Sequence, residues 1–207
     1  GHFLPRPDVL DLLDRLSASG TRLIYDESFS DFVDGTEDHS LIDADLLSRY
    51  PGLVAVKSIS KSYGVPGIRL GVIASGDKDL LARVRSRLSI WNINSFGEQF
   101  FQVVGKSKSD FRTACRLIAE ERESLFSRLR EIPYLRPFPS KANYILCEVK
   151  APWTPTRLAE ALLGRHWLFI KDCTGKIGFE TTPCVRLTVR DRKDNDALMA
   201  ALRSLAS

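Results

Sequence analysis

The chain has 207 residues, enough to bury a sizeable core as one large domain or two small ones. Its 43% hydrophobic and 27% charged residues are ordinary for a soluble globular protein, and the net charge of +4 comes from basic and acidic residues mixed along the sequence. No basic run carries interleaved aromatic residues, and no apolar stretch approaches about 20 residues, so we expect no nucleic-acid partner and no membrane span.

The thiols and imidazoles are scattered along the sequence. No Cys-x-x-Cys pair is present, so the sequence indicates neither a zinc site nor a disulfide framework, and we expect a reduced, cytoplasmic setting. The three histidines give little support to a metal site or to a Ser-His-Asp arrangement. The residues concerned are Cys115, Cys147, Cys173 and Cys184, and His2, His39 and His166.

The first half of the chain alternates helices with short apolar strands. Gly1 to Pro5 is typical of a loop that leads into a helix and contains no initiator methionine, so we expect the first part of the protein to be missing. Helices are predicted over 7–16 and 44–49, and strands over 22–25 and 53–56. This alternation favours a mostly parallel α/β sheet, in which ligands gather at the carboxyl ends of the strands.

The second half begins with helices and ends in a smaller unit. We expect helices over 77–87, 96–104 and 110–130, and three prolines after residue 130 suggest a domain boundary, which divides the chain into domains 1–130 and 131–207. The smaller domain reads as an α+β unit: strand 142–149, helix 156–163, strand 167–170, strand 185–189 and helix 194–205.

The stretch from Lys57 to Gly71 carries the strongest chemical signal. Ser58, Ser60 and Lys61 follow a predicted strand, and a glycine- and proline-rich turn then leads to Arg69. An amine among hydroxyls and a guanidinium suits a phosphorylated aldehyde, which the lysine would bind as a Schiff base. A lysine after a strand is more often merely solvated, and Ser-x-x-Lys also occurs in penicillin-binding proteins, but their Ser-Asp-Asn and Lys-Thr-Gly motifs are absent here.

Further candidate residues lie outside this stretch. Asp26 follows a strand, where a carboxylate would pair with a protonated ring nitrogen or would serve only as a helix cap or surface charge. Arg186 would bind a substrate carboxylate through a bidentate fork if it faces the cleft, with Arg190 and Lys171 as secondary candidates. Asn143 and the segment 91–94 would line the cleft, although core and loop positions need no such function.

Taken together, these segments resemble the fold-type I pyridoxal-phosphate enzymes of the class I/II aminotransferase group. Within the group the chain is similar to histidinol-phosphate aminotransferase and threonine-phosphate decarboxylase. The resemblance implies a transferase-like three-layer sandwich, with a partial large domain built on a mostly parallel sheet and a small α+β carboxyl-terminal domain. It covers nearly the whole chain in the expected order, through residues 24–29, 58–71, 140–149, 168–179 and 185–202.

The resemblance also implies roles for individual residues. Lys61 would form the internal aldimine with pyridoxal 5'-phosphate and then move the substrate α-proton, while Asp26 would pair with the pyridine nitrogen. Ser58, Ser60 and Arg69 would hold the cofactor phosphate. Arg186, with Asn143 nearby, would hold the substrate carboxylate. Family dimers build each site from two chains, so we expect a homodimer, and weak or no activity from this carboxyl-terminal part by itself.

Two positions depart from the aminotransferase pattern. Phe29 stands where most aminotransferases have a tyrosine whose hydroxyl contacts the cofactor, and Arg190 stands where the histidinol-phosphate branch tends to have glycine. Both are nearer the decarboxylase pattern. The resemblance as a whole implies an aminotransferase that exchanges an amino acid, possibly phosphorylated, with a 2-oxo acid. The alternatives are a threonine-phosphate-type decarboxylase and a catalytically silent binding domain.

Overall fold

A computed structural model describes residues 1–34 and 39–206. Its contacts divide the chain into two compact units. Leu4–Cys115 form what we call the Lys61 unit, and Gly1–Phe3 with Arg116–Ser207 form the Arg186 unit. The domain division predicted from the sequence, at residue 130, stays a prediction.

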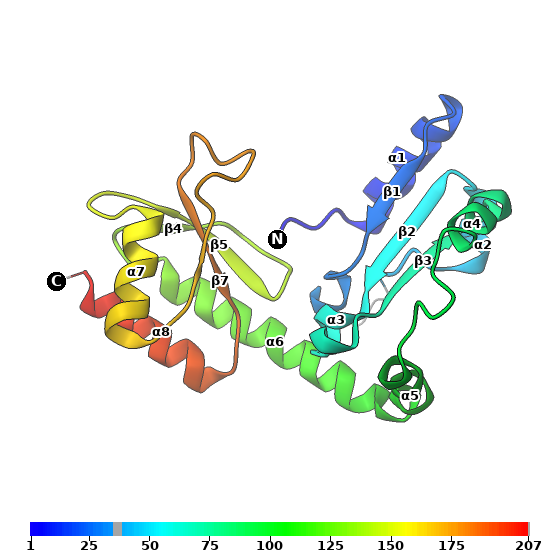
Figure 1. The fold of residues 1–207 in the computed structure, drawn as a ribbon. Helices are drawn as coiled ribbons and strands as arrows, with labels where there is room; N and C mark the ends of the chain where they lie inside the picture. The colour runs from blue at the N-terminus through cyan, green and yellow to red at the C-terminus, as the bar shows by residue number, and fades with distance from the viewer. Residues whose placement is uncertain (35–38, 207) are drawn as a thin grey trace. The chain divides into compact units, whose positions relative to one another are not determined.

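The Lys61 unit is built on a three-stranded sheet of order β1-β2-β3, with β2 in the middle (Figure 1). The strands β1 and β2 are parallel, whereas β2 and β3 are antiparallel. The link from β2 to β3 holds only one turn of helix and one 3-10 turn, which is too little for a parallel crossover. The bounds are β1 Leu23–Asp26, β2 Leu53–Ser58, β3 Gly71–Ser75, α3 Ile59–Ser62 and η2 Pro66–Ile68.

One face of this sheet packs on helices α1, Arg6–Ala18, and α2, Ala44–Arg49. The core between them contains Val9, Leu13, Leu41, Leu46, Tyr50 and Leu53, with Leu23 and Tyr25 packed against it. On the opposite face, the register aligns Ile24 with Val54 and Asp26 with Val56. Ile24 is 72% exposed there, so Asp26 belongs to the more open face of the sheet.

Short polar side chains begin α2 and two later helices of the Lys61 unit. Asp43, Asp77 and Asn94 each accept a hydrogen bond from the backbone N–H three residues later, which satisfies a donor that the helix leaves free. The predicted helices near residues 44, 77, 96 and 110 are therefore confirmed, with shifted ends except in α2. Their bounds are α4 Lys78–Arg85, α5 Ser95–Val104 and α6 Lys108–Leu129, with 3-10 turns η1 Ser30–Phe32 and η3 Gly105–Ser107.

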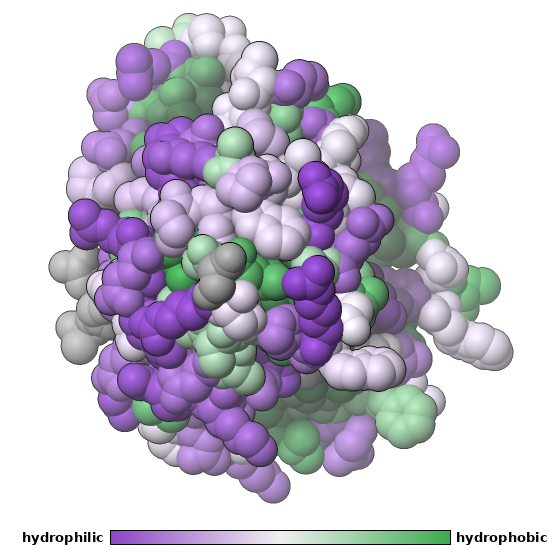
Figure 2. Space-filling model, turned by 90° about the vertical axis from the view of Figure 1, so that its left-hand side faces the viewer, coloured by the Kyte–Doolittle hydropathy of each residue, from purple (hydrophilic) through white to green (hydrophobic). Residues whose placement is uncertain are grey.

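The Arg186 unit contains a four-stranded antiparallel sheet of order β4-β5-β7-β6. Burial alternates along β5, so one face holds the core, which includes Ile145, Leu187 and Met199 and part of α6. The face of the molecule in Figure 2 is mostly hydrophilic, with apolar side chains between the polar ones. The bounds are β4 Leu135–Pro137, β5 Tyr144–Val149, α7 Pro155–His166, β6 Lys171–Asp172, β7 Cys184–Thr188 and α8 Arg192–Ser204.

The predicted strand over 167–170 is wrong. Helix α7 continues to His166, and Trp167 then caps it with a left-handed backbone at φ 57°. The strand β6 begins later, at Lys171. Along the described residues, no helix combines the length and apolarity that a membrane span requires.

Candidate active site

Asp26 and Ser58 lie on neighbouring strands at the same end of the sheet. The register aligns Asp26 with Val56 across the parallel pair, and Ser58 is the last residue of β2. Asp26 is exposed, as a residue that contacts a ligand must be. The structure therefore brings together the two polar groups that the sequence placed at adjacent strand ends.

Ser28 connects these two groups, although no sequence pattern singled it out. Its backbone N–H donates to Asp26 Oδ1 at 2.9 Å, and its hydroxyl donates to the same oxygen at 2.5 Å. The hydroxyl also accepts a hydrogen bond from the backbone N–H of Ser58 at 2.8 Å. This bridge is found only from the structure, because serine is common in loops and its presence after a strand predicts no particular hydrogen bond.

Lys61 lies in the single helical turn α3, directly after β2. Ile59 N–H donates to the carbonyl oxygen of Leu70 at 3.2 Å, so the turn is attached to the start of β3. Lys61 is exposed, whereas Ser60 is only 6% exposed. The lysine amine is thus available to a ligand, and a phosphate-binding role for Ser60 requires approach through its backbone or a partly covered hydroxyl.

Arg69 has a strained backbone at the beginning of β3. Its φ of 62° and ψ of 46° are left-handed, a conformation that side chains other than glycine rarely adopt. The side chain is exposed, and its Nη1 donates to the carbonyl oxygen of Pro66 at 3.1 Å. Strain of this kind is often retained where a side chain has a functional position to keep.

Lys57, which lies in β2 four residues before Lys61, is already paired. Lys57 Nζ is 2.8 Å from Asp31 Oδ1, and the two side chains are 16% and 18% exposed. Close to this pair, the ring of Tyr63 stacks on Phe111 with a centroid distance of 4.2 Å. Burial, and secondarily Asp31, raise the pKa of the Tyr63 hydroxyl. The amine of Lys57 is therefore held in an ion pair with Asp31 of the turn η1, and Lys61 is the exposed amine.

Phe29 precedes the turn η1 and is half-buried. The neighbouring Glu27, which the sequence analysis did not single out, is 1% exposed. Its carboxylate accepts hydrogen bonds from Ser40 Oγ at 2.7 Å and from Leu41 N–H at 2.9 Å. Glu27 thus attaches Ser40 and Leu41 to the end of β1, next to Asp26.

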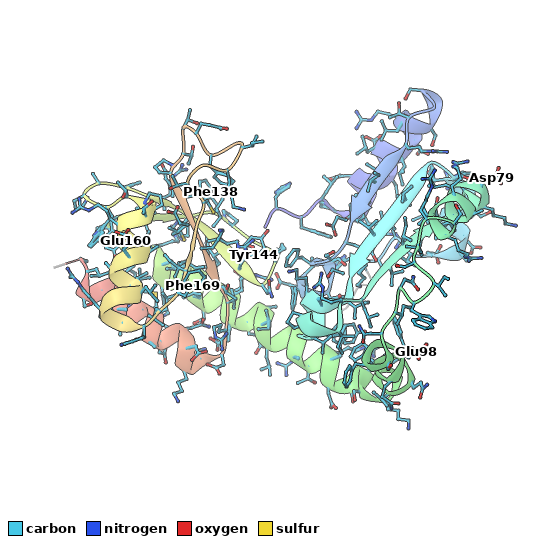
Figure 3. The ribbon with its side chains drawn as sticks, in the orientation of Figure 1. Asp79, Glu98, Phe138, Tyr144, Glu160 and Phe169 are labelled. Carbon is cyan, nitrogen blue, oxygen red and sulfur yellow. The ribbon has the colours of Figure 1, made fainter. Side chains whose placement is uncertain are left out.

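The other two predicted site residues belong to the Arg186 unit. Arg186 is exposed on β7, and its guanidinium lies 5.0 Å from the ring centroid of Tyr144, which is labelled on β5 in Figure 3. The backbone carbonyl of Asn143 accepts from Val189 N–H at 2.9 Å. Their roles toward a substrate stay predictions.

Several secondary candidates have structural explanations. Arg190 forms an ion pair with Asp194 one helical turn further on, and its N–H donates to Asn195 Oδ1 at 3.1 Å. Asn94 caps α5 and donates to the carbonyl oxygen of Ile68 at 2.9 Å. Both side chains are therefore occupied in holding their own segments.

The chemistry of these side chains fits pyridoxal 5'-phosphate. Lys61 offers an exposed amine for an aldehyde, and Asp26 offers a carboxylate for a protonated ring nitrogen. Both oxygens of a carboxylate can accept, and no donor to Asp26 Oδ2 is found within the described part of the chain, whereas Oδ1 receives two. Ser58 and Arg69 add a hydroxyl and a guanidinium for a phosphate.

The arrangement of strands and helices is that of the fold-type I pyridoxal-phosphate enzymes. A decarboxylase from Sulfurospirillum multivorans has a similar solved structure, with a TM-score of 0.87 and 28% identity over 100% of this chain and 58% of its own. The family profile described as "Aminotransferase class I and II" matches residues 1–202. The chain therefore belongs to the class I and II aminotransferase family.

Three curated relatives refine the comparison. CMP-5'-(3-aminopropyl)phosphonate synthase of Streptomyces rubellomurinus is 32% identical over 98% of the chain. Threonine-phosphate decarboxylase of Salmonella typhimurium is 27% identical over 97%, and histidinol-phosphate aminotransferase of Thermoanaerobacter pseudethanolicus is 26% identical over 99%. The chain covers 32%, 53% and 54% of these relatives, respectively. Pyridoxal 5'-phosphate is the cofactor of the family.

Proposed function

We propose that this chain carries the cofactor-binding part of a pyridoxal-phosphate-dependent aminotransferase. The observation that supports this most directly is the group of side chains at one end of the β1-β2-β3 sheet, where Asp26 and Ser58 share a hydrogen-bonded bridge and Lys61 follows on the next turn. The matched family is the second support.

Each residue would have a distinct task. Lys61 would attach to the cofactor aldehyde, and its amine, once released by substrate, would move the proton at the substrate α-carbon. Asp26 would hold the proton on the ring nitrogen, and Ser58, Ser60 and Arg69 would bind the phosphate, with Phe29 beside the cofactor. The bound cofactor supplies an electron sink for the electron pair left on that carbon. Arg186 and Asn143 would orient the substrate carboxylate.

The amino substrate would carry a phosphate or phosphonate. The relatives include a threonine-phosphate decarboxylase, a histidinol-phosphate aminotransferase and a CMP-5'-(3-aminopropyl)phosphonate synthase. The amino acceptor would be a 2-oxo acid such as pyruvate or 2-oxoglutarate. We propose a homodimer in a reducing, cytoplasmic setting, which suits four cysteines that are free thiols.

A phosphoamino-acid decarboxylase is the second candidate. Phe29 supports it, because it lacks the hydroxyl that the aminotransferase pattern places there, and the decarboxylases among the relatives support it as well. In a decarboxylase the same residues would bind the cofactor, but the substrate would be held so that it loses its carboxylate in place of its α-proton. A third possibility, a silent binding domain, is disfavoured because Lys61, Asp26, Arg69 and Arg186 are all retained.

One assay separates these candidates. The holoenzyme is incubated with phosphothreonine, which has both an α-proton and a carboxylate, and both 2-oxo-acid-dependent amino transfer and carbon dioxide release are measured. An aminotransferase gives the first product alone, and a decarboxylase gives the second. If the protein with added cofactor develops no visible absorbance band and neither product, the enzyme proposal fails and a binding role remains.

A further inference from the structure

The hydroxyl of Ser28 has a hydrogen bond of fixed direction. A backbone N–H can only donate, so the bond from Ser58 N–H to Ser28 Oγ, 2.8 Å long, occupies a lone pair of the hydroxyl. The hydroxyl proton is then left for Asp26 Oδ1 at 2.5 Å, and the ionised carboxylate is an acceptor only. The direction of this short chain of bonds, from Ser58 through Ser28 to Asp26, follows from the donors alone.

The bridge also restricts the carboxylate. Asp26 is exposed and would otherwise be free to rotate about its side-chain bonds, but Oδ1 is fixed by two donors from a single residue. Ser28 itself is 7% exposed, so water competes little for its hydroxyl. The result is a carboxylate whose Oδ1 accepts two hydrogen bonds from Ser28, while Oδ2 has no donor within the described residues.

We propose that Ser28 is a positioning residue, which commits Asp26 Oδ1 and thereby presents Oδ2 to the ring nitrogen of pyridoxal 5'-phosphate. This inference rests on the role proposed above for Asp26. The same serine joins the ends of β1 and β2, so it also sets the distance between the carboxylate and Ser58, which directly precedes the turn that carries Lys61. A group that orients a ligand-binding side chain in this way contributes to affinity without touching the ligand.

Ser30 offers a matched control. It is 8% exposed, it lies two residues from Ser28, and its hydroxyl donates to the backbone carbonyl of Glu27 at 2.9 Å. It thus shares the residue type, the burial and a hydroxyl hydrogen bond with Ser28, but among the described residues it makes no hydrogen bond to Asp26. A loss caused only by removing a buried hydroxyl from this loop should appear equally in both serines.

The test measures the dissociation constant of pyridoxal 5'-phosphate by absorbance titration of the purified protein, together with the thermal midpoint of the cofactor-free form. We expect Ser28→Ala to weaken binding roughly tenfold, the size typical of a lost hydrogen bond to a charged group. Ser28→Thr, which keeps the hydroxyl, should restore most of that affinity. Ser30→Ala should bind as the unaltered protein does, whatever its thermal midpoint.

A double-mutant cycle with Asp26→Asn separates positioning from general support. If Ser28 acts through the carboxylate, adding Ser28→Ala to Asp26→Asn should cause little further loss of affinity. An equal loss in both backgrounds, or equal losses from Ser28→Ala and Ser30→Ala, would overturn the positioning role and leave the role of Asp26 intact. Unchanged binding by Asp26→Asn would instead overturn the assignment of Asp26 and, with it, this inference.

Discussion

Arg69 combines an exposed guanidinium with a backbone conformation that favours glycine. A left-handed residue other than glycine costs roughly 1–2 kcal/mol, because its Cβ approaches the following carbonyl oxygen. We therefore expect Arg69→Gly to raise the free energy of unfolding of the cofactor-free protein by about 1 kcal/mol. The same change should weaken pyridoxal-phosphate binding, because it removes a phosphate ligand. Denaturant unfolding and cofactor titration measure the two effects.

Trp167 provides the control for this prediction. It has the same kind of backbone, with φ at 57°, and its side chain is 89% exposed. Trp167→Gly should stabilise the protein by a similar amount and leave the affinity for the cofactor unchanged. If Arg69→Gly stabilises the protein and binds the cofactor with full affinity, then Arg69 is not a phosphate ligand.

Residue types at strand ends were sufficient to predict that Asp26 and Ser58 lie near each other. The contribution of Ser28 was not predictable, because it depends on one hydroxyl lying between two strands, and sequence patterns report strands and not their side-chain distances. The ion pairs of Lys57 and Arg190 could not be predicted either, because the partner of each, Asp31 or Asp194, is not marked by any sequence motif.

At the scale of elements, a buried asparagine joins α8 to its neighbours. Asn195 is 1% exposed, its Nδ2 donates to the carbonyl oxygen of Arg190 at 2.8 Å and to Glu121 Oε2 at 3.1 Å, and its Oδ1 accepts from Arg190 N–H. We expect Asn195→Ala to lower the free energy of unfolding by about 2–3 kcal/mol, because it leaves these groups unsatisfied. Urea unfolding measures this loss.

A surface position on the same helix serves as the comparison for Asn195. Ala200 is exposed on α8, so Ala200→Ser should change the free energy of unfolding by less than about 0.5 kcal/mol. A loss from Asn195→Ala that is no larger than this would show that the hydrogen bonds to Arg190 and Glu121 do not support the unit.

The buried thiol in α6 gives a pH dependence. Burial, and secondarily the carboxylate of Asp31, raise the pKa of Cys115 to about 11, whereas an unfolded cysteine has a pKa of about 8.5. Between these values the folded protein holds a proton that the unfolded chain has lost, so this contribution to stability is full below the lower value and falls as the pH rises. Unfolding measured from neutral pH upward should show this decline, and Cys115→Ala should make it shallower.

The helices were well predicted from the sequence, because amphipathic spacing acts locally. The strand over 167–170 was mispredicted because its apolar residues suited a strand, while the helix before it extended by three residues into a left-handed cap at Trp167. The strand β4 was missed because its segment contains Pro137, which is tolerated at the edge of the sheet.

At the scale of the whole molecule, the predicted site draws on both compact units. Lys61, Asp26 and Arg69 belong to one unit, and Arg186 and Asn143 belong to the other. Sequence resemblance assigns all of them to one site, and local geometry supports the first group through the ties between β1, β2 and β3. The assignment of Arg186 and Asn143 to the same site is a prediction. We expect Arg186→Ala to lose affinity for the substrate and to keep its affinity for the cofactor, and binding measurements with each ligand test this.

The attachment of pyridoxal 5'-phosphate to Lys61 is the central claim. The most direct measurement is reduction of the holoenzyme with borohydride, followed by mass spectrometry of its peptides. The account predicts a reduced pyridoxyl group on Lys61, which is exposed. It predicts none on Lys57, which lies four residues before Lys61 and forms an ion pair with Asp31. A pyridoxyl group on Lys57 or on another lysine, with Lys61 unmodified, would contradict the account.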